Sequence, residues 1–216
     1  MPSIAVSQTQ GQLRLLAVAR QPVRSASSDE EILAGLMAGE RWAAEALYDR
    51  VHVAVRGSLR RILRGQGADY DDLMQASFER ILEVLSRRGL ESPYNLPAWA
   101  GAVSARVALD VLRRRVREQR IFEGDGRLGS QPIEGVDPER SVSARSEVAR
   151  AQRLLSMLKP AQAEALVLHD VLGHDLKAIA ELTGVSVAAA QSRLSRGRRE
   201  LMRRAGKTAQ RGRDGA

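Results

Sequence analysis

The chain has 216 residues, with 34 Lys and Arg against 26 Asp and Glu, a net charge of +8, no Cys and 44% hydrophobic residues. This length allows one large or two small domains, and the lack of Cys excludes disulfides, Cys-bound metal clusters and thiol catalysis. Only 2 Trp, 3 Tyr and 2 Phe are present, which argues against a typical β-sandwich and favours an all-α fold. No apolar run reaches the roughly 20 residues of a membrane span, so we expect a soluble protein without membrane insertion.

The N-terminal residues 1–28 carry three Arg and no acid, which predicts a disordered extension. Order is expected to begin at Ser28 and Asp29, whose side chains can cap a helix. Apolar residues at helical spacing then predict helices over 29–38, 42–63, 69–88 and 97–120. These four helices form a predicted first domain over residues 29–120.

The third of these helices carries a polar, acidic stripe at helical spacing, formed by Asp72, Gln75, Glu79 and Glu83. Such a stripe is unexpected on a basic protein. The block 104–120 instead holds six Arg against two acids, and residues 193–216 hold nine basic residues against two acids. Two basic patches far apart in sequence suggest a polyanion contacted at two places, although solvated helix faces are the alternative for either patch alone.

Turn-forming and acidic residues over 121–137 predict a flexible linker and a domain boundary. Helical periodicity returns over 138–205 and contains a helix-turn-helix pattern: Ala180 is small, Gly184 can turn the chain and Ser186 can cap the second helix. On that second helix a wheel places Ala188, Ala189 and Ser192 outward at the start and Arg196, Arg199 and Arg203 outward later. This face suits entry into a major groove. Residues 206–216 are expected to form a disordered basic tail.

Patterns that would indicate an enzyme are weak. His169-Asp170 and His174-Asp175 lie five residues apart with Gly173 between them, which does not suit metal binding. Gly206-Lys207-Thr208 resembles the end of a phosphate-binding loop, but the required upstream Gly is Leu201. We therefore expect no catalysis, no metal site and no cofactor.

The order of these features resembles that of an extracytoplasmic-function (group four) sigma factor of bacterial RNA polymerase. The resemblance is carried by Asp71-Asp72-Leu73-Met74-Gln75-Ala76-Ser77-Phe78, by the stretch from Leu96-Pro97-Ala98-Trp99 to Arg113-Arg114-Arg115, and by the stretch from Leu158-Lys159-Pro160 to Leu201. It is nearly continuous from about residue 29 to 205. It implies an all-α fold of two small helical domains, sigma domain two (29–120) and sigma domain four (138–205), joined by the flexible linker 121–137.

The resemblance implies a bacterial, cytoplasmic protein that binds core RNA polymerase, recognises the minus-thirty-five and minus-ten promoter elements and promotes melting. Its partners would be core polymerase, double-stranded promoter DNA, the melted non-template strand and, as a further candidate, an anti-sigma factor. Polymerase contacts would come from Asp72, Leu73, Gln75, Phe78 and Glu79. Minus-ten contacts would come from Arg106, Asp110, Arg113, Arg114, Arg115 and Arg117. Minus-thirty-five contacts would come from Ser186, Ala188, Ala189, Gln191, Ser192, Arg193, Arg196 and Arg199.

Three positions depart from the family pattern. Ala105-Arg106 stands where an Arg-Asn pair is usual, Val111 where His or Tyr is frequent, and Ala189 where Thr is common. We therefore expect weaker discrimination at the flipped minus-ten base. The main alternative function is a helix-turn-helix transcriptional regulator with an N-terminal sensing or dimerising bundle. A basic RNA-binding or membrane-surface adaptor fits only the charge.

Overall fold

The computed structural model describes residues 27–64, 70–88, 95–124 and 138–213, and these residues form helices and turns only. This confirms the all-α fold for the described part of the chain. The helices are α1 (Asp29–Met37), α2 (Arg41–Leu63), α3 (Tyr70–Arg88), α4 (Leu96–Gly124), α5 (Pro138–Ser156), α6 (Pro160–Leu166), the π-helical turn η1 (Val167–Val171), α7 (Leu176–Thr183) and α8 (Val187–Arg213).

The first helix begins where the sequence predicts. The Ser28 hydroxyl accepts a hydrogen bond from the Glu31 amide at 3.2 Å, and the Glu31 carboxylate accepts one from the Ser28 amide at 2.9 Å. This capping box satisfies two amides that would otherwise lack partners at the helix start. The Asp29 carboxylate does not cap this helix. It accepts hydrogen bonds from Arg50 of α2 at 2.6 Å and from the Leu96 amide of α4 at 3.0 Å. Asp29 thereby joins α1 to two other helices.

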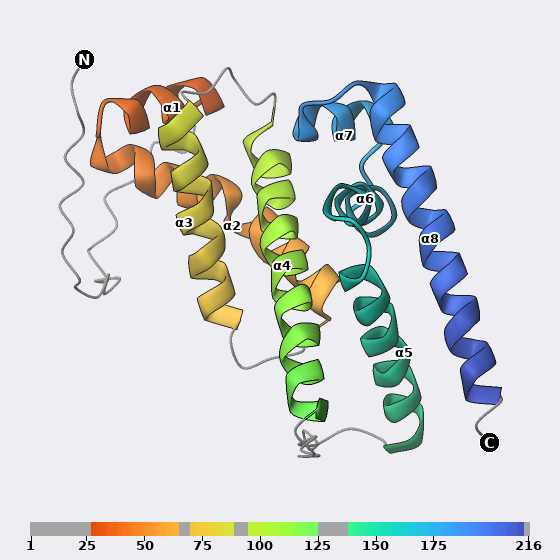
Figure 1. Cartoon of the computed structure of the whole chain (residues 1–216). Helices are drawn as coiled ribbons and strands as arrows, with labels where there is room; N and C mark the ends of the chain where they lie inside the picture. The colour runs from red at the N-terminus through yellow and green to blue at the C-terminus, as the bar shows by residue number, and fades with distance from the viewer. Residues whose placement is uncertain (1–26, 65–69, 89–94, 125–137, 214–216) are drawn as a thin grey trace.

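Helices α1 to α4 form a first helical group, and α2 and α4 pack together at its centre. The α2 residues Leu47, Val51, Val55 and Leu59 repeat four apart and are at most 2% exposed, as expected for an apolar face that packs on another helix. Helix α4 packs on α2 and carries small buried residues at 100, 102, 105 and 108. In Figure 1, α4 lies between α3 and α5. Small side chains on α4 suit this position, because they let neighbouring helices approach closely.

The second helical group contains α5 to α8, with α6 packed against α8. Gly197 of α8 is buried at this crossing, where a Cβ would lie 3.0 Å from the Gln162 carbonyl oxygen. A larger residue would push the two helices apart. The turn of the helix-turn-helix matches the sequence prediction, since Gly184 has φ +66° and the Ser186 hydroxyl accepts from the Ala189 amide at 3.2 Å.

The two helical groups pack directly on each other, and their buried residues form one continuous core. Gln152 of α5 is 6% exposed, and its side-chain amide donates to the Ile62 carbonyl of α2 at 3.0 Å. The predicted linker was too long at its start, because α4 continues to Gly124. Its remaining residues 125–137 lie outside the described part of the chain, as do residues 1–26 of the predicted extension.

The predicted disordered tail is also wrong for most of its length, because α8 continues to Arg213. The packing of α5 along α8 gives a reason: the Arg150 guanidinium donates to the Ala205 carbonyl of α8 at 3.0 Å. Tertiary contact of this kind stabilises a helix beyond what its local sequence would support.

Candidate functional site

The acidic stripe predicted on the third helix lies on the surface of α3. Asp72, Gln75 and Glu79 are exposed, and the Gln75 side-chain amide donates to the Glu79 carboxylate at 3.0 Å. Leu73 differs from the others, because it is only 7% exposed and belongs to the core. In this structure the Leu73 side chain points inward and packs in the core, so its predicted contact with polymerase stays a prediction.

Phe78 connects the stripe to the neighbouring helix. Its ring stacks on Tyr48 of α2 with 4.8 Å between ring centroids, and Tyr48 stacks on His52 at 5.4 Å. Tyr48 is 45% exposed. The apolar spacing of α2 predicts only a helix that packs in the core, so the sequence analysis did not predict the surface stack formed by Tyr48 and His52. The one available signal is that Tyr48 and His52 are four residues apart and thus share a helix face.

A groove of about 550 Å³ runs between α3 and α4. Residues from two predicted surfaces line it together, namely Glu79 of the polymerase-binding set and Arg106 and Asp110 of the minus-ten set. Glu83 and Arg80 complete its charged rim and bind each other. Residues predicted for polymerase binding and residues predicted for minus-ten binding therefore line the same groove.

The predicted minus-ten cations differ in their availability. Arg113 binds Asp110 at 2.7 Å and its side chain is only 19% exposed. Its Nη2 atom is buried without a hydrogen-bond partner among the described residues. Arg114 is 65% exposed and lies 3.8 Å from Glu118, Arg115 is half-buried, and Arg117 is exposed. Of these four arginines, Arg114 and Arg117 are thus the exposed ones, and Arg113 is largely covered.

Arg106 lies at the contact between the two helical groups. Its guanidinium binds the Glu164 carboxylate of α6, and its Nη2 atom is 3.4 Å from the Leu182 carbonyl oxygen of α7. Neither partner could be anticipated from the sequence, because they lie 58 and 76 residues further along the chain. Arg106 is 43% exposed and Glu164 is 14% exposed.

The predicted minus-thirty-five residues lie at the N-terminal cap and on the first half of α8. Ser186, Ala188, Gln191, Arg196 and Arg199 are exposed, whereas Ala189, Ser192 and Arg193 are half-buried. Neither Arg196 nor Arg199 forms an ion pair with a described residue. Arg203, one turn further along, donates twice to the Glu200 carboxylate at 2.6 and 2.7 Å. Hydrogen bonds from Arg203 and Arg204 lower the pKa of Glu200 to about 2, so this pair persists at neutral pH.

The dipeptide His169-Asp170 has a structural partner that sequence reasoning missed. The Arg198 Nε atom of α8 donates to Asp170 Oδ2 at 3.1 Å, and His169 Nδ1 is 2.7 Å from Asp170 Oδ1. Asp170 belongs to η1, a π-helical turn, and such turns are frequent at functional sites. Hydrogen bonds from Arg198, reinforced by His169, lower the pKa of Asp170 below its ordinary value.

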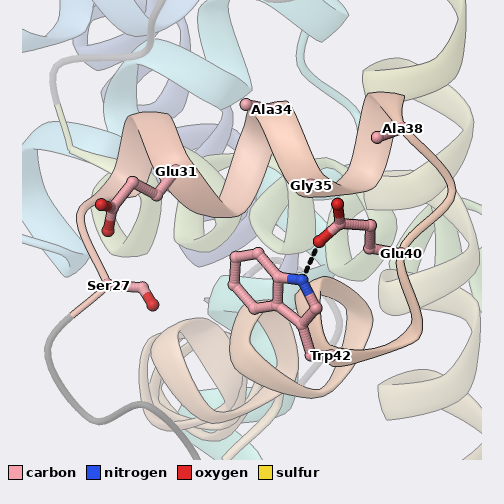
Figure 2. Close-up of a pocket in the computed structure, with 7 residues that line it drawn as sticks. All are labelled: Ser27, Glu31, Ala34, Gly35, Ala38, Glu40 and Trp42. Atoms are coloured by element: carbon pink, nitrogen blue, oxygen red, sulfur yellow. Dashed lines mark hydrogen bonds between the residues drawn. The ribbon is translucent and has the colours of Figure 1, made fainter.

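A second pocket, of about 670 Å³, lies between α1 and α2. Figure 2 shows the Trp42 ring beneath α1, with its Nε1 donating to the Glu40 carboxylate. The ring approaches the bare backbone of Gly35, where a Cβ would lie 2.8 Å from a Trp42 ring carbon. Ser27 and Glu31 line the other end of the pocket, and its polar groups converge on no common point in Figure 2.

Among the described residues, no group of three or more His, Asp or Glu side chains is arranged to hold a metal ion. No helix in the described ranges is both long and apolar enough to cross a membrane.

Comparisons with known proteins agree with this arrangement. Residues 47–118 match the family described as Sigma-70 region 2, and residues 149–201 match Sigma-70 region 4. The chain is 30% identical over 184 residues to the ECF RNA polymerase sigma factor SigM of Mycobacterium tuberculosis, covering 83% of this chain and 86% of that protein. It is 30% identical over 139 residues to the RNA polymerase sigma factor CnrH of Cupriavidus metallidurans, covering 62% of this chain and 71% of CnrH.

Among solved structures, that of CnrH in complex with the cytosolic domain of CnrY is similar, with a TM-score of 0.47 and 23% identity. It covers 84% of this chain and 99% of the CnrH chain.

Proposed function

This chain belongs to the extracytoplasmic-function sigma factor family, and we propose that it serves transcription initiation through three surfaces on its two helical groups. It is an alternative sigma factor, whose partners are core RNA polymerase and promoter DNA. The polymerase supplies all covalent chemistry, and the sigma factor itself is no enzyme. Its place of action is the cytoplasm, where polymerase and promoter are found.

The polymerase-docking surface in this proposal consists of Asp72, Gln75, Phe78 and Glu79 on α3. The acids and the amide are exposed and lie along one face, while Phe78 adds an aromatic contact beside them. Protein interfaces commonly place aromatic rings at their centre and polar groups at their rim. Leu73 is left out of this surface because it is buried.

The minus-ten surface in this proposal consists of Arg106, Asp110, Arg114, Arg115 and Arg117, with Arg113 in a supporting position. Cations on one helix face can follow a single-stranded backbone, and a guanidinium can also stack on an unpaired base. Arg106 cannot both donate and accept at one base edge, unlike the Asn usual in the family. This difference supports the expectation of weaker base discrimination at that position.

The minus-thirty-five surface in this proposal consists of Ser186, which caps α8, and the exposed face of α8 as far as Arg199. Small residues at its start let the helix enter the major groove, and Arg196 can reach a guanine edge while Arg199 reaches phosphate. The alternative of a regulator with a sensing bundle is not retained, because the first helical group matches Sigma-70 region 2. An anti-sigma partner, which the family resemblance implies, stays a prediction.

The observation that carries the proposal is that one chain combines a region 2 and a region 4, in that order, with exposed acids on α3 and exposed cations on α8. Transcription by purified core polymerase, with and without this chain, tests it on a fragmented genomic template from the source bacterium. We expect defined new transcripts only when the chain is added. A chain that binds duplex DNA specifically by itself, and yields no transcript with core polymerase, would contradict the proposal.

A further inference from the structure

The first turn of α8 presents an apolar side chain to solvent. Val187 precedes Leu194 by two helical turns, so the helical period puts both side chains on one face of α8. Leu194 is 4% exposed, as expected for the buried face, whereas Val187 is 47% exposed. The rest of the described protein thus covers Leu194 but leaves Val187 accessible, which the helical period alone does not predict.

The backbone around Val187 is fixed by the helix cap. The Ser186 hydroxyl accepts a hydrogen bond from the Ala189 amide at 3.2 Å, and the Ser186 carbonyl accepts one from the Ala190 amide at 2.9 Å. A valine within a helix also has one strongly preferred χ1 rotamer. Val187 is therefore a rigid apolar group, and a contact with it costs little conformational entropy.

Gln191 lies one turn further along, on the same side of α8 as Val187. Residues four apart on a helix have their Cβ atoms about 5–6 Å apart. Gln191 is exposed, and its side chain has no hydrogen-bond partner among the described residues. The amide donor and acceptor of Gln191 are thus accessible beside the apolar surface of Val187.

No charged side chain interrupts this part of α8. Residues 187–192 are uncharged, whereas residues 193–204 contain six Arg. Arg199 lies about 18 Å beyond Val187 along the helix axis, and the major groove is about 12 Å wide. When the first turn of α8 is at the base edges, Arg199 is therefore at the phosphates that border the groove. The uncharged start of α8 is then the part that meets the bases.

An A·T base pair offers partners for both exposed side chains. In the major groove it displays the adenine N7 acceptor and N6 donor, together with the C5-methyl group of thymine. A glutamine amide can donate to N7 and accept from N6 at the same time, and an apolar side chain can cover the methyl group. The separation of about 5–6 Å between the two residues corresponds to one or two base-pair steps of about 3.4 Å.

We propose that Val187 and Gln191 read A·T pairs in the minus-thirty-five element: Val187 covers a thymine methyl group, and Gln191 binds the edge of an adenine in the same or the next pair. The proposal rests on the proposed function, because it requires α8 to enter the major groove of that element. It adds Val187 to the minus-thirty-five surface and names the bases that this surface prefers.

The methyl contact is tested by removing the methyl group from the DNA. Core polymerase with this chain first selects its minus-thirty-five element from promoter duplexes that are randomised in that region. The selected duplex is then made with each thymine of the element replaced singly by uracil, which lacks only the C5-methyl group. At one fixed salt concentration, we expect one of these replacements to weaken binding about fourfold, which corresponds to about 0.8 kcal/mol for one buried CH₂-sized group.

Val187→Ala completes a double-variant cycle with this replacement. On the thymine duplex it should bind about fourfold more weakly than the parent, and uracil should then change its binding by less than about twofold. Val53→Ala is the matched control, because Val53 is 60% exposed but lies on α2, and it should keep the parent's sensitivity to uracil. The proposal is overturned if the selected element has no thymine, if the parent is indifferent to every uracil, or if Val187→Ala stays as sensitive as the parent.

Gln191→Glu tests the adenine contact without removing the side chain. A carboxylate can accept from cytosine N4 but cannot donate to adenine N7. Selection by this variant should therefore exchange one adenine of the element for cytosine, and retention of every adenine would overturn the role given to Gln191. If core polymerase with the parent chain selects no element at all, the proposed function itself is wrong. Selection of an element that is insensitive to uracil overturns only the base reading by Val187.

Discussion

Arg198 of α8 binds Asp170 of η1 across the helix-turn-helix domain, with its Nε atom 3.1 Å from Asp170 Oδ2. The contact joins α8, the helix that we propose to contact DNA, to the π-helical turn that follows α6. Arg198 is itself exposed but is held by this ion pair, whereas the exposed Arg196 and Arg199 form no ion pair with a described residue. Arg198 thus helps to fix the orientation of α8, the helix that also carries Arg196 and Arg199.

Asp170→Asn should lower the thermal stability of the protein at pH 7, by no more than about 3 °C because the pair is half-exposed. The Asp170 pKa is lowered in the folded state by Arg198 and His169. Its contribution to stability is therefore present above the unfolded pKa of about 3.9 and is lost as the pH falls through the lower folded pKa.

Melting curves of wild type and Asp170→Asn between pH 7 and pH 3 test this. The difference between the two melting temperatures should shrink as the pH falls. Glu181→Gln, an exposed acid in the same domain, provides the control and should show no such pH-dependent difference. A constant difference across this pH range would mean that the carboxylate charge does not matter.

Replacing Asp72 or Gln75 by Ala should weaken binding to core polymerase by about 2 to 5 kcal/mol if the contact is desolvated in the complex. Both side chains are exposed in the free protein, so helicity and melting temperature should not change. Glu147→Ala is the control, since Glu147 is an exposed acid on α5 outside the proposed surface. Core binding is measured by titration with labelled sigma factor; equal affinities for all three variants would remove the α3 surface from the proposal.

Arg199 and Arg203 should contribute differently to the salt dependence of DNA binding. Arg199 has no ion-pair partner among the described residues, and Arg199→Ala should reduce the slope of log K against log salt by about 0.9. Arg203 is already bound to Glu200, whose pKa of about 2 keeps it charged. Arg203→Ala should therefore reduce the slope by less than half as much, measured on a 30-base-pair duplex. Equal reductions would show that Glu200 releases Arg203 on binding DNA.

Promoter opening should depend on the exposed cations of α4. Arg114→Ala and Arg117→Ala should reduce opening on linear templates more than on supercoiled ones, because negative supercoiling offsets part of the cost of strand separation. Permanganate footprinting with core polymerase measures the open region. Arg61→Ala removes an exposed arginine of α2 and should open both templates normally. If Arg114→Ala and Arg117→Ala open linear DNA normally, this part of α4 is not the surface that promotes melting.

Gly35→Ala should destabilise the first helical group by about 1 to 3 kcal/mol, as overpacking does. The new Cβ would lie 2.8 Å from both the Ala43 Cβ and a Trp42 ring carbon. Gly57→Ala, also within a helix, meets nothing within 4 Å and should stabilise by about 0.4 to 1 kcal/mol. Urea unfolding of the two variants and the wild type measures these changes in the free energy of unfolding. A stable Gly35→Ala protein would mean that Trp42 can move aside.

Local sequence signals determined the helices and the helix-turn-helix of this protein. The capping box at Ser28, the left-handed turn at Gly184 and the cap at Ser186 are set by residues within a few positions of one another, and such short-range chemistry is readable from the chain. The apolar spacing of α2 and the polar stripe of α3 follow from the helical period in the same way. The family motifs extended this reading to function.

Only the tertiary structure decided how these helices use their polar residues. The sequence predicts that Arg106 binds DNA, whereas in the folded protein Arg106 forms an ion pair with Glu164. Leu73 of the polymerase motif is buried in the core. Arg198 is likewise paired with Asp170 of η1, an acid that a helical wheel of α8 does not include. Ion pairs between residues 28 or 58 positions apart depend on how helices cross, and periodicity within one helix carries no information about that crossing.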